Sequence, residues 1–220
     1  MSYRPIRRDL ITEKQKCHFC SRALNSLKAY VLENIETKEI IYAGLKCAGN
    51  NIDSQYKLAL IPDFTRYTLS MSEREINPVN SKQGNEKIDN TTSDEDEKRR
   101  NAIEYIELRE DKLVENFKTS YPILKIYFDK HLVSELNDNE IKHIFNIEKN
   151  APETLKLMNL QKCYNYLFWI NVAIGKLGDD SDKFLKSVRK YLIINKGITE
   201  DQKVAVNKWI VNLSNVPQLK

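Results

Sequence analysis

The chain has 220 residues, of which 41% are hydrophobic and 30% charged, so it can bury one medium-sized core or two small ones in water. Its net charge of +4 is too small to identify a nucleic-acid-binding protein by itself. No apolar run approaches the ~18 residues of a membrane-spanning helix, and no apolar segment follows the charged N-terminus. We therefore expect a cytoplasmic protein that does not interact with membranes.

Three of the four cysteines lie in the N-terminal quarter of the chain. Cys17 and Cys20 form a CxxC pair, and Cys47 follows them. A CxxC turn can present two thiolates to one tetrahedral ion, so this spacing predicts a Zn²⁺ site. One alternative is that the cysteines are small buried apolar side chains. Another is a CxxC redox pair, which is typical of a βαβ unit rather than of the sequence that follows here.

Two β-prone runs separate the CxxC pair from the third cysteine. Residues 29–34 and 39–43 are rich in β-branched and aromatic side chains and flank a short polar stretch, which predicts a β-hairpin. Cys47 then stands at the start of a segment that can be helical. These elements predict a small zinc-finger domain over residues 1–70, with a basic arm at its N-terminus.

This arrangement resembles the treble-clef-like zinc modules of phage, plasmid and defence proteins, in which a CxxC turn, a hairpin and a GxxC sequence hold one zinc ion. The matching residues are Cys17, Cys20, Gly44 and Cys47. The resemblance implies a fourth ligand shortly after Cys47, where this chain has Asn50, a poor zinc ligand. The fourth position is therefore open, and its candidates are water and the side chains of His18, Asp53, His131, His143 and Cys163.

Basic residues are frequent around the cysteines. The first 30 residues contain 7 Lys or Arg against 2 Asp or Glu. Such an excess can bind phosphate, and a flexible arginine arm can follow a groove or a single strand. Ordinary solvated surface is the alternative. The candidate nucleic-acid-binding residues are Arg4, Arg7, Arg8, Lys14, Lys16, Arg22 and Lys46.

Residues 71–97 differ in composition from the rest of the chain. They include no aromatic residue and few large apolar ones, so they cannot bury enough surface to offset the entropy of ordering. This composition predicts a flexible linker. From residue 98 to residue 220 the pattern is helical and predicts an all-α bundle of about six antiparallel helices. The overall prediction is thus an α+β protein.

Helix signals divide the second half of the chain. The first helix is expected over about 97–118 and the longest over about 153–176. Cys163, Trp169 and Trp209 lie in apolar helical stripes and are predicted to be core residues. One later helix has a basic face that can contact phosphate or simply be solvated, and its residues are Lys183, Lys186, Arg189 and Lys190.

The sequence has no Walker loop, dinucleotide-binding glycine pattern, HExxH motif or triad signature, which favours a non-enzymatic protein. Our leading hypothesis is a zinc-finger protein that binds DNA or RNA together with protein partners. A finger followed by helices also resembles the Cas8-like large subunit of type IV CRISPR complexes, which implies a role in recognising the motif that flanks the target. The alternatives are a protein–protein adaptor or inhibitor with a structural zinc ion, and a zinc-dependent enzyme.

Overall fold

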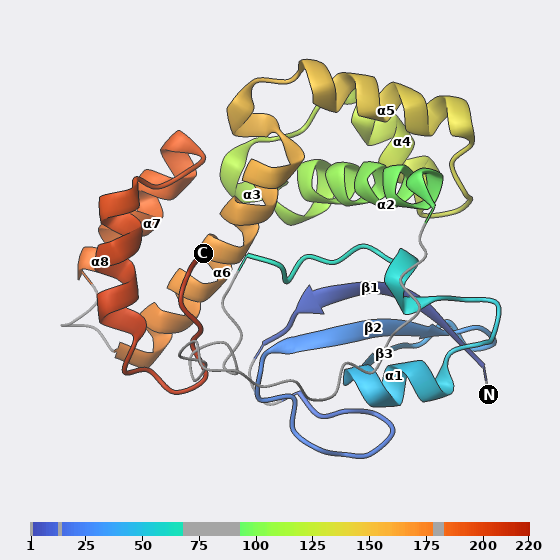
Figure 1. The fold of residues 1–220 in the computed structure, drawn as a ribbon, viewed down its shortest axis with the longest axis horizontal. Helices are drawn as coiled ribbons and strands as arrows, with labels where there is room; N and C mark the ends of the chain where they lie inside the picture. Colours follow the sequence, from blue (N-terminus) through green and yellow to red (C-terminus); the bar gives the residue numbers. More distant parts are fainter. Residues whose placement is uncertain (1, 13–14, 68–92, 178–182) are drawn as a thin grey trace, which may run out of the picture.

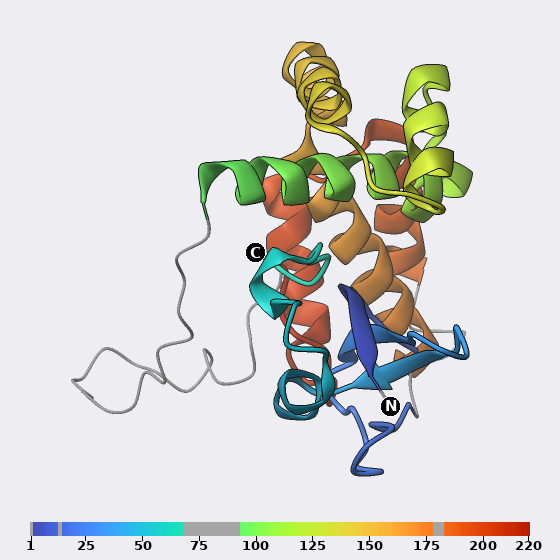
Figure 2. The same ribbon diagram turned by 90° about the vertical axis from the view of Figure 1, so that its right-hand side faces the viewer.

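The computed structural model describes residues 2–12, 15–67, 93–177 and 183–220, in which a small antiparallel sheet lies beside a group of helices (Figure 1, Figure 2). The chain is α+β, as expected. The strands are β1 (Tyr3–Leu10), β2 (Lys28–Asn34) and β3 (Ile40–Ala43). The α-helices are α1 (Leu45–Asn51), α2 (Asp94–Glu107), α3 (Val114–Phe117), α4 (Pro122–His131), α5 (Asp138–Asn150), α6 (Leu157–Leu177), α7 (Lys183–Asn195) and α8 (Glu200–Ile210). Three short segments are η1 (Leu58–Leu60), η3 (Leu108–Lys112) and η4 (Glu153–Leu155).

The sheet has the order β1-β2-β3, with both neighbours antiparallel. The predicted hairpin is present as β2 and β3. Asn34 closes the turn between them, because its side-chain oxygen accepts hydrogen bonds from the N–H groups of Glu36 at 2.9 Å and Thr37 at 3.1 Å. Lys38 takes a left-handed backbone conformation (φ 63°) at the end of this turn. Local side-chain chemistry therefore fixes the register of the hairpin.

The N-terminal segment, which the sequence suggested was a flexible arm, is strand β1. Its backbone pairs along the length of β2, from Tyr3 opposite Asn34 to Leu10 opposite Lys28. A register shift between Pro5 and the arginines that follow accommodates the proline, which has no N–H to donate. Buried side chains at both ends of the strand anchor it to the sheet. The prediction of an arm was wrong because strand pairing depends on a partner that is distant in sequence.

Part of the predicted linker is helical. Most of residues 71–97 lie outside the described residues, but α2 already begins at Asp94. Ser93 caps this helix, since its Oγ accepts a hydrogen bond from the Asp96 N–H at 3.1 Å and the Asp96 carboxylate accepts one from the Ser93 N–H at 3.4 Å. Acidic residues in the first turn also favour a helix N-terminus. The helix thus starts three residues before residue 97, where it was expected to begin.

The first helix of the second half is interrupted, in contrast to the single helix expected over about 97–118. Segment η3 is π-helical, and the Leu113 N–H donates to the carbonyl of Leu108, five residues back, at 3.0 Å. Lys118 then ends α3 in the left-handed conformation (φ 50°). The widened turn changes which side chains face the core, an effect that periodicity in the sequence does not reveal.

The longest helix also begins later than the expected residue 153. Residues 153–155 form the 3-10 segment η4, and α6 starts at Leu157, whose N–H donates to a Glu148 carboxylate oxygen at 3.1 Å. Seven α-helices lie in the described residues after 92, where about six were expected. Helix α2 lies across α6 in both views, so these two helices are not antiparallel neighbours (Figure 1, Figure 2). None of the described helices has the length and apolar character needed to cross a membrane.

Two clusters of apolar side chains form the core. The smaller one lies around the sheet and includes Cys17 and Leu32. The larger one fills the helical half, where Trp169 is fully buried as expected, whereas Trp209 is 41% exposed. Three residues from the N-terminal part also belong to the larger cluster, namely Leu10, Leu27 and Phe64. The sheet and the helices therefore share apolar contacts.

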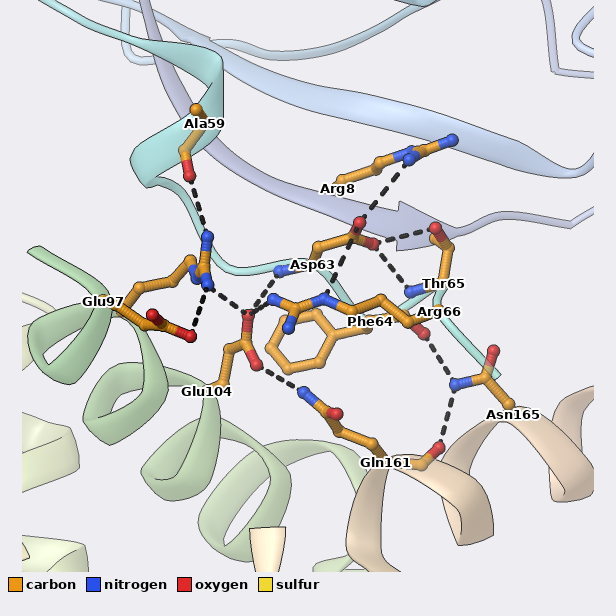
Figure 3. Close-up of polar contacts among 11 residues, drawn as sticks. Arg8, Ala59, Asp63, Phe64, Thr65, Arg66, Glu97, Glu104, Gln161 and Asn165 are labelled. Carbon is orange, nitrogen blue, oxygen red and sulfur yellow. Dashed lines mark hydrogen bonds and ion pairs between the residues drawn. The ribbon is translucent and has the colours of Figure 1, made fainter. Parts of the chain in front are cut away.

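A buried carboxyl group connects the segment that contains Asp63 and Arg66 to two helices (Figure 3). Glu104 in α2 is fully buried, and its Oε1 accepts a hydrogen bond from the Asp63 N–H at 2.9 Å. The same carboxylate pairs with Arg66 and accepts a hydrogen bond from the side-chain amide of Gln161 in α6. Arg100, one helical turn before Glu104, lies at 3.9 Å from it.

A second polar contact joins β1 directly to the helices. Asp9 is almost fully buried and accepts a hydrogen bond from the Tyr164 hydroxyl of α6 at 2.7 Å. The Lys112 ammonium of η3 lies 2.8 Å from the same carboxylate. Burial works against ionisation of Asp9, but Lys112 and Arg7 outweigh it and lower the pKa of this carboxyl group. Asp9 is thus held as a carboxylate between the sheet and the helices.

The surroundings of Glu104 raise the pKa of its carboxyl group, whereas those of Asp9 lower it. Burial raises the pKa of Glu104 from 4.5 to about 7, despite the opposing effects of Arg66, the Asp63 N–H and Arg100. In the unfolded chain the pKa returns to its ordinary value. Between these two values the folded state binds more protons than the unfolded state, so stability falls as the pH rises.

We predict that Glu104→Gln removes this part of the pH dependence. Wild-type unfolding free energy should fall by up to about 3 kcal/mol between about pH 5 and about pH 7.5 because of Glu104, whereas glutamine does not titrate. Urea unfolding of both proteins at the two pH values measures the difference, and all other titrating groups are common to both. Parallel pH profiles for the two proteins would contradict the prediction.

Candidate metal centre

The three N-terminal cysteines come together in space. The Sγ atoms of Cys17, Cys20 and Cys47 all lie within 4.8 Å of one another, and none of the three forms a disulfide. Thiolates bound to a tetrahedral zinc ion at about 2.3 Å would lie about 3.8 Å apart, which small side-chain adjustments can reach from this arrangement. The cluster can therefore hold a metal ion.

A hydrogen-bonded turn presents the CxxC pair. The Cys17 N–H donates to the carbonyl of Arg22 at 2.8 Å, and the Ser21 N–H donates to the carbonyl of Cys17 at 2.8 Å. Ser21 takes a left-handed backbone conformation (φ 57°) that turns the chain back on itself. The His18 N–H donates to the carbonyl of Tyr42 in β3 at 2.9 Å. The turn is thus anchored to the sheet.

Helix α1 presents the third thiol. Ala48, next to Cys47, is fully buried against the sheet, and its N–H donates to the carbonyl of Gly44 at 2.8 Å. Gly44, part of the GxxC pattern, has an ordinary extended conformation (φ −73°), and an added Cβ would meet only Leu24 at 3.7 Å. Neither backbone strain nor lack of space therefore requires glycine at this position.

The electrostatics of the cluster favour a cation. Burial raises the pKa of Cys17, but hydrogen bonds from the N–H groups of Gly44, Cys20 and Phe19 outweigh this effect and lower the pKa to about 7. Hydrogen bonds with the other two thiols raise the pKa of Cys47 to about 11, since a second negative charge there is unfavourable. A bound metal ion supplies the compensating charge and allows all three thiols to ionise.

The candidate fourth ligands close in sequence do not join the cluster. No other cysteine, histidine or carboxylate in the described parts of the chain lies with the three sulfurs. The Asp53 carboxylate accepts hydrogen bonds from the Ser2 hydroxyl at 2.8 Å and the Gln55 N–H at 3.1 Å. The His18 ring packs edge-on against the ring of Phe19. Asn50 is exposed.

The distant candidates are occupied elsewhere. Cys163 is fully buried in the helical core, as expected, and burial raises the pKa of its thiol to about 12. The His143 ring shares a hydrogen bond of 2.7 Å with the Tyr127 hydroxyl. His131 lies 3.8 Å from Glu107. Within the described residues, the metal centre therefore has three protein ligands.

The three arginines of β1 pair with carboxylates. Arg8 also lies over the ring of Tyr30, 5.5 Å from its centre. These contacts reduce the capacity of the arginines to bind phosphate. The pairs are Arg4–Glu33 at 3.0 Å, Arg7–Asp9 at 2.8 Å and Arg8–Asp63 at 3.5 Å.

The remaining basic candidates have a different environment. Lys16, Arg22 and Lys46 are exposed, and none has a carboxylate partner in the described part of the chain. Lys16 directly precedes Cys17, and Lys46 directly precedes Cys47, so these two lysines are sequence neighbours of two of the three cysteines. Lys14, the other candidate, lies outside the described residues. We define Lys16, Arg22 and Lys46 as the basic rim.

The basic residues of α7 are separate from the basic rim. Helix α7 contacts α6 and lies, with α8, on the side of the molecule away from α1 (Figure 1). Lys183 and Lys190 are exposed there, whereas Arg189 is half-buried. The structure therefore does not bring the two sets of basic residues together.

Comparison of the chain with models of known protein families, with curated proteins and with solved structures finds no match. The functional argument consequently depends on the metal centre and its surroundings.

We predict that the full chain binds one thiophilic divalent ion through these three cysteines. Titration with Co²⁺ should produce thiolate-to-metal absorption, because ionised sulfur is the donor. Cys20→Ser should weaken binding of the ion by at least about 100-fold, since a thiolate ligand is lost. Cys163→Ala is the matched control and should leave the affinity unchanged. Equal metal binding by Cys20→Ser and wild type would exclude this site.

Proposed function

We propose that the N-terminal part is a zinc-stabilised module that binds nucleic acid through the basic rim. Within this proposal the protein is non-enzymatic and acts with protein partners in a nucleoprotein complex. The observation that supports this proposal is that Lys16, Arg22 and Lys46, close in sequence to the three cysteines, are exposed and have no carboxylate partner in the described part of the chain. The resemblance to Cas8-like subunits depends only on a finger that precedes helices, so the proposal does not extend to that identity.

The chemistry of the donor set supports zinc as the ion. Thiolates select soft or borderline metals, and zinc prefers tetrahedral sulfur and nitrogen sites. Cys17, Cys20 and Cys47 would hold the ion and connect the CxxC turn to α1. The role of the metal is then to stabilise a small fold, because the residues beside the sulfurs are basic rather than acidic.

The basic rim can contact phosphates without breaking existing ion pairs. An exposed lysine or arginine gains most when it replaces condensed counterions on a nucleic acid backbone. The β1 arginines would first have to leave Glu33, Asp9 or Asp63. We therefore assign phosphate contact to the basic rim and a structural role to the arginines.

A protein–protein adaptor is the second candidate, and several exposed apolar side chains favour it. In and just after α4, Ile126 is 62% exposed, Leu132 65% and Val133 85%. Exposed apolar groups of this kind are typical of protein contact sites. The separation of α7 from the basic rim also fits two independent contact surfaces. In this case the zinc ion would be purely structural and the protein would not bind nucleic acid.

A salt series tests the first candidate against the second. We expect zinc-loaded wild type to bind DNA or RNA at low salt, with an affinity that falls steeply as salt is added. Changing Lys16, Arg22 and Lys46 together to glutamine should reduce the magnitude of the log–log salt slope by about 2 to 3, which corresponds to the loss of up to three phosphate contacts. Fluorescence anisotropy with single- and double-stranded oligonucleotides measures these slopes.

The control removes the same charge from exposed lysines elsewhere. Lys142, Lys149 and Lys208 are exposed without an ion pair in the described residues, and their triple glutamine variant should keep the wild-type slope. Chelation of the metal should abolish binding, because it releases the turn that carries Lys16 and Arg22. An absence of binding by zinc-loaded wild type at low salt would favour the adaptor instead.

A further inference from the structure

The π-helical segment η3 holds an arginine in an unusual environment. Arg109 is only 5% exposed. Its Nε donates to the carbonyl of Thr119, and its Nη1 donates to the Tyr105 hydroxyl at 2.7 Å. Both partners are uncharged groups, and both residues are themselves buried. Arginine is rarely buried to this extent without an anionic partner.

No carboxylate pairs with this guanidinium in the described residues. Glu148 and Glu110 are close enough to influence the neighbouring Tyr105, but neither forms an ion pair within 4.0 Å of the guanidinium. Both are already engaged. Glu110 accepts hydrogen bonds from the Ser120 hydroxyl at 2.6 Å and from a backbone N–H, and Glu148 accepts one from the N–H that opens α6. The guanidinium lies over the ring of Tyr105, 5.5 Å from its centre, but its positive charge has no anionic partner among the described residues.

Arg109 lines an open cavity of about 440 Å³ between η3, α5 and the segment that leads to α6. The third guanidinium nitrogen, Nη2, has no hydrogen-bond partner within the described chain, yet it is not among the fully enclosed unpaired atoms. This nitrogen is therefore open to solvent in a residue that lines the cavity.

The other cavity walls combine polar groups with an apolar side. Asn146 and His143 come from α5, and the Nδ1 atom of His143 is engaged with Tyr127, which leaves Nε2 available. Ile147 and Leu155 provide apolar surface. A cavity of this size with a few convergent polar groups fits a small organic molecule.

We propose that this cavity binds a small molecule that carries an oxyanion, a carboxylate or a phosphate, with Arg109 as its cationic partner. Arginine binds both groups through paired N–H donors, and the low-dielectric surroundings strengthen the contact. The Asn146 amide adds a neutral donor, and the apolar wall takes the carbon portion of the molecule. This site is separate from the metal centre and from the basic rim.

The test uses defined probes on the full chain. Inorganic phosphate and hexanoate represent the two oxyanions, and hexanamide is the neutral counterpart of hexanoate. We expect saturable shifts in the side-chain NMR signals of Asn146 and His143 with at least one oxyanion and none with hexanamide. The oxyanion that binds more tightly identifies the source of the anionic group.

A substitution on the exposed cavity wall checks the location of the site. Asn146→Asp places a carboxylate in the cavity, which repels the ligand and competes for Arg109, and we expect binding to weaken by at least about tenfold. Asn139→Asp makes the same chemical change on α5 outside the cavity and should keep wild-type affinity. Arg109 itself is left intact, because its loss would also break the contacts with Thr119 and Tyr105.

Three results would overturn the proposal. One is that the wild-type protein shows no saturable binding of either oxyanion at concentrations up to ~100 mM. Another is equal weakening of binding by Asn139→Asp and Asn146→Asp. The third is binding of hexanamide as tight as that of hexanoate, which would show a purely apolar pocket.

Discussion

The buried carboxylate of Glu104 is the contact on which the arrangement of the molecule depends. It receives the backbone N–H of Asp63 and the side chains of Arg66 and Gln161, so it joins the segment that contains Asp63 and Arg66 to α2 and α6 (Figure 3). A buried carboxyl group needs several hydrogen-bond partners to compensate for the loss of water. The network therefore fixes this segment on the helices, and Asp9 makes a second connection from β1.

The presence or absence of an acidic partner also distinguishes the basic residues with a structural role from those that are candidates for function. The arginines of β1 are paired with carboxylates, within the sheet for Arg4 and Arg7 and with Asp63 for Arg8. The residues of the basic rim have no carboxylate partner in the described part of the chain. Arg109 is a third case, because it is buried and has no carboxylate partner among the described residues. The two proposals, a polyanion at the basic rim and a small oxyanion beside Arg109, rest on this difference in pairing.

The elements that the sequence predicted are those set by local chemistry. The hairpin follows from two β-prone runs and a polar turn that Asn34 closes. The cysteine cluster follows from ligand spacing. The helix that begins after Thr199 starts with a local capping box, in which the Thr199 hydroxyl accepts a hydrogen bond from the Gln202 N–H at 3.2 Å. In each case residues within a few positions of one another determine the conformation.

The features that could not be predicted from the sequence depend on contacts between residues that are distant in the chain. Strand β1 forms because β2 offers it an edge, and no pattern in residues 3–10 alone distinguishes a strand from an arm. The π-helical turn at η3 replaces a regular helix because packing around it selects which side chains are buried. Glu104 and Arg109 resemble surface residues of an amphipathic helix until their neighbours are known.

The sequence by itself determined that this protein is α+β, that three cysteines near its N-terminus can share a metal ion, and that basic residues accompany them. Ligand spacing and turn chemistry are local, so they can be recognised in the sequence without knowledge of the fold. Only the tertiary structure decided which basic side chains are neutralised and which remain exposed. It also decided that Arg109 is buried beside a cavity, because burial and charge pairing depend on contacts between segments far apart in the chain.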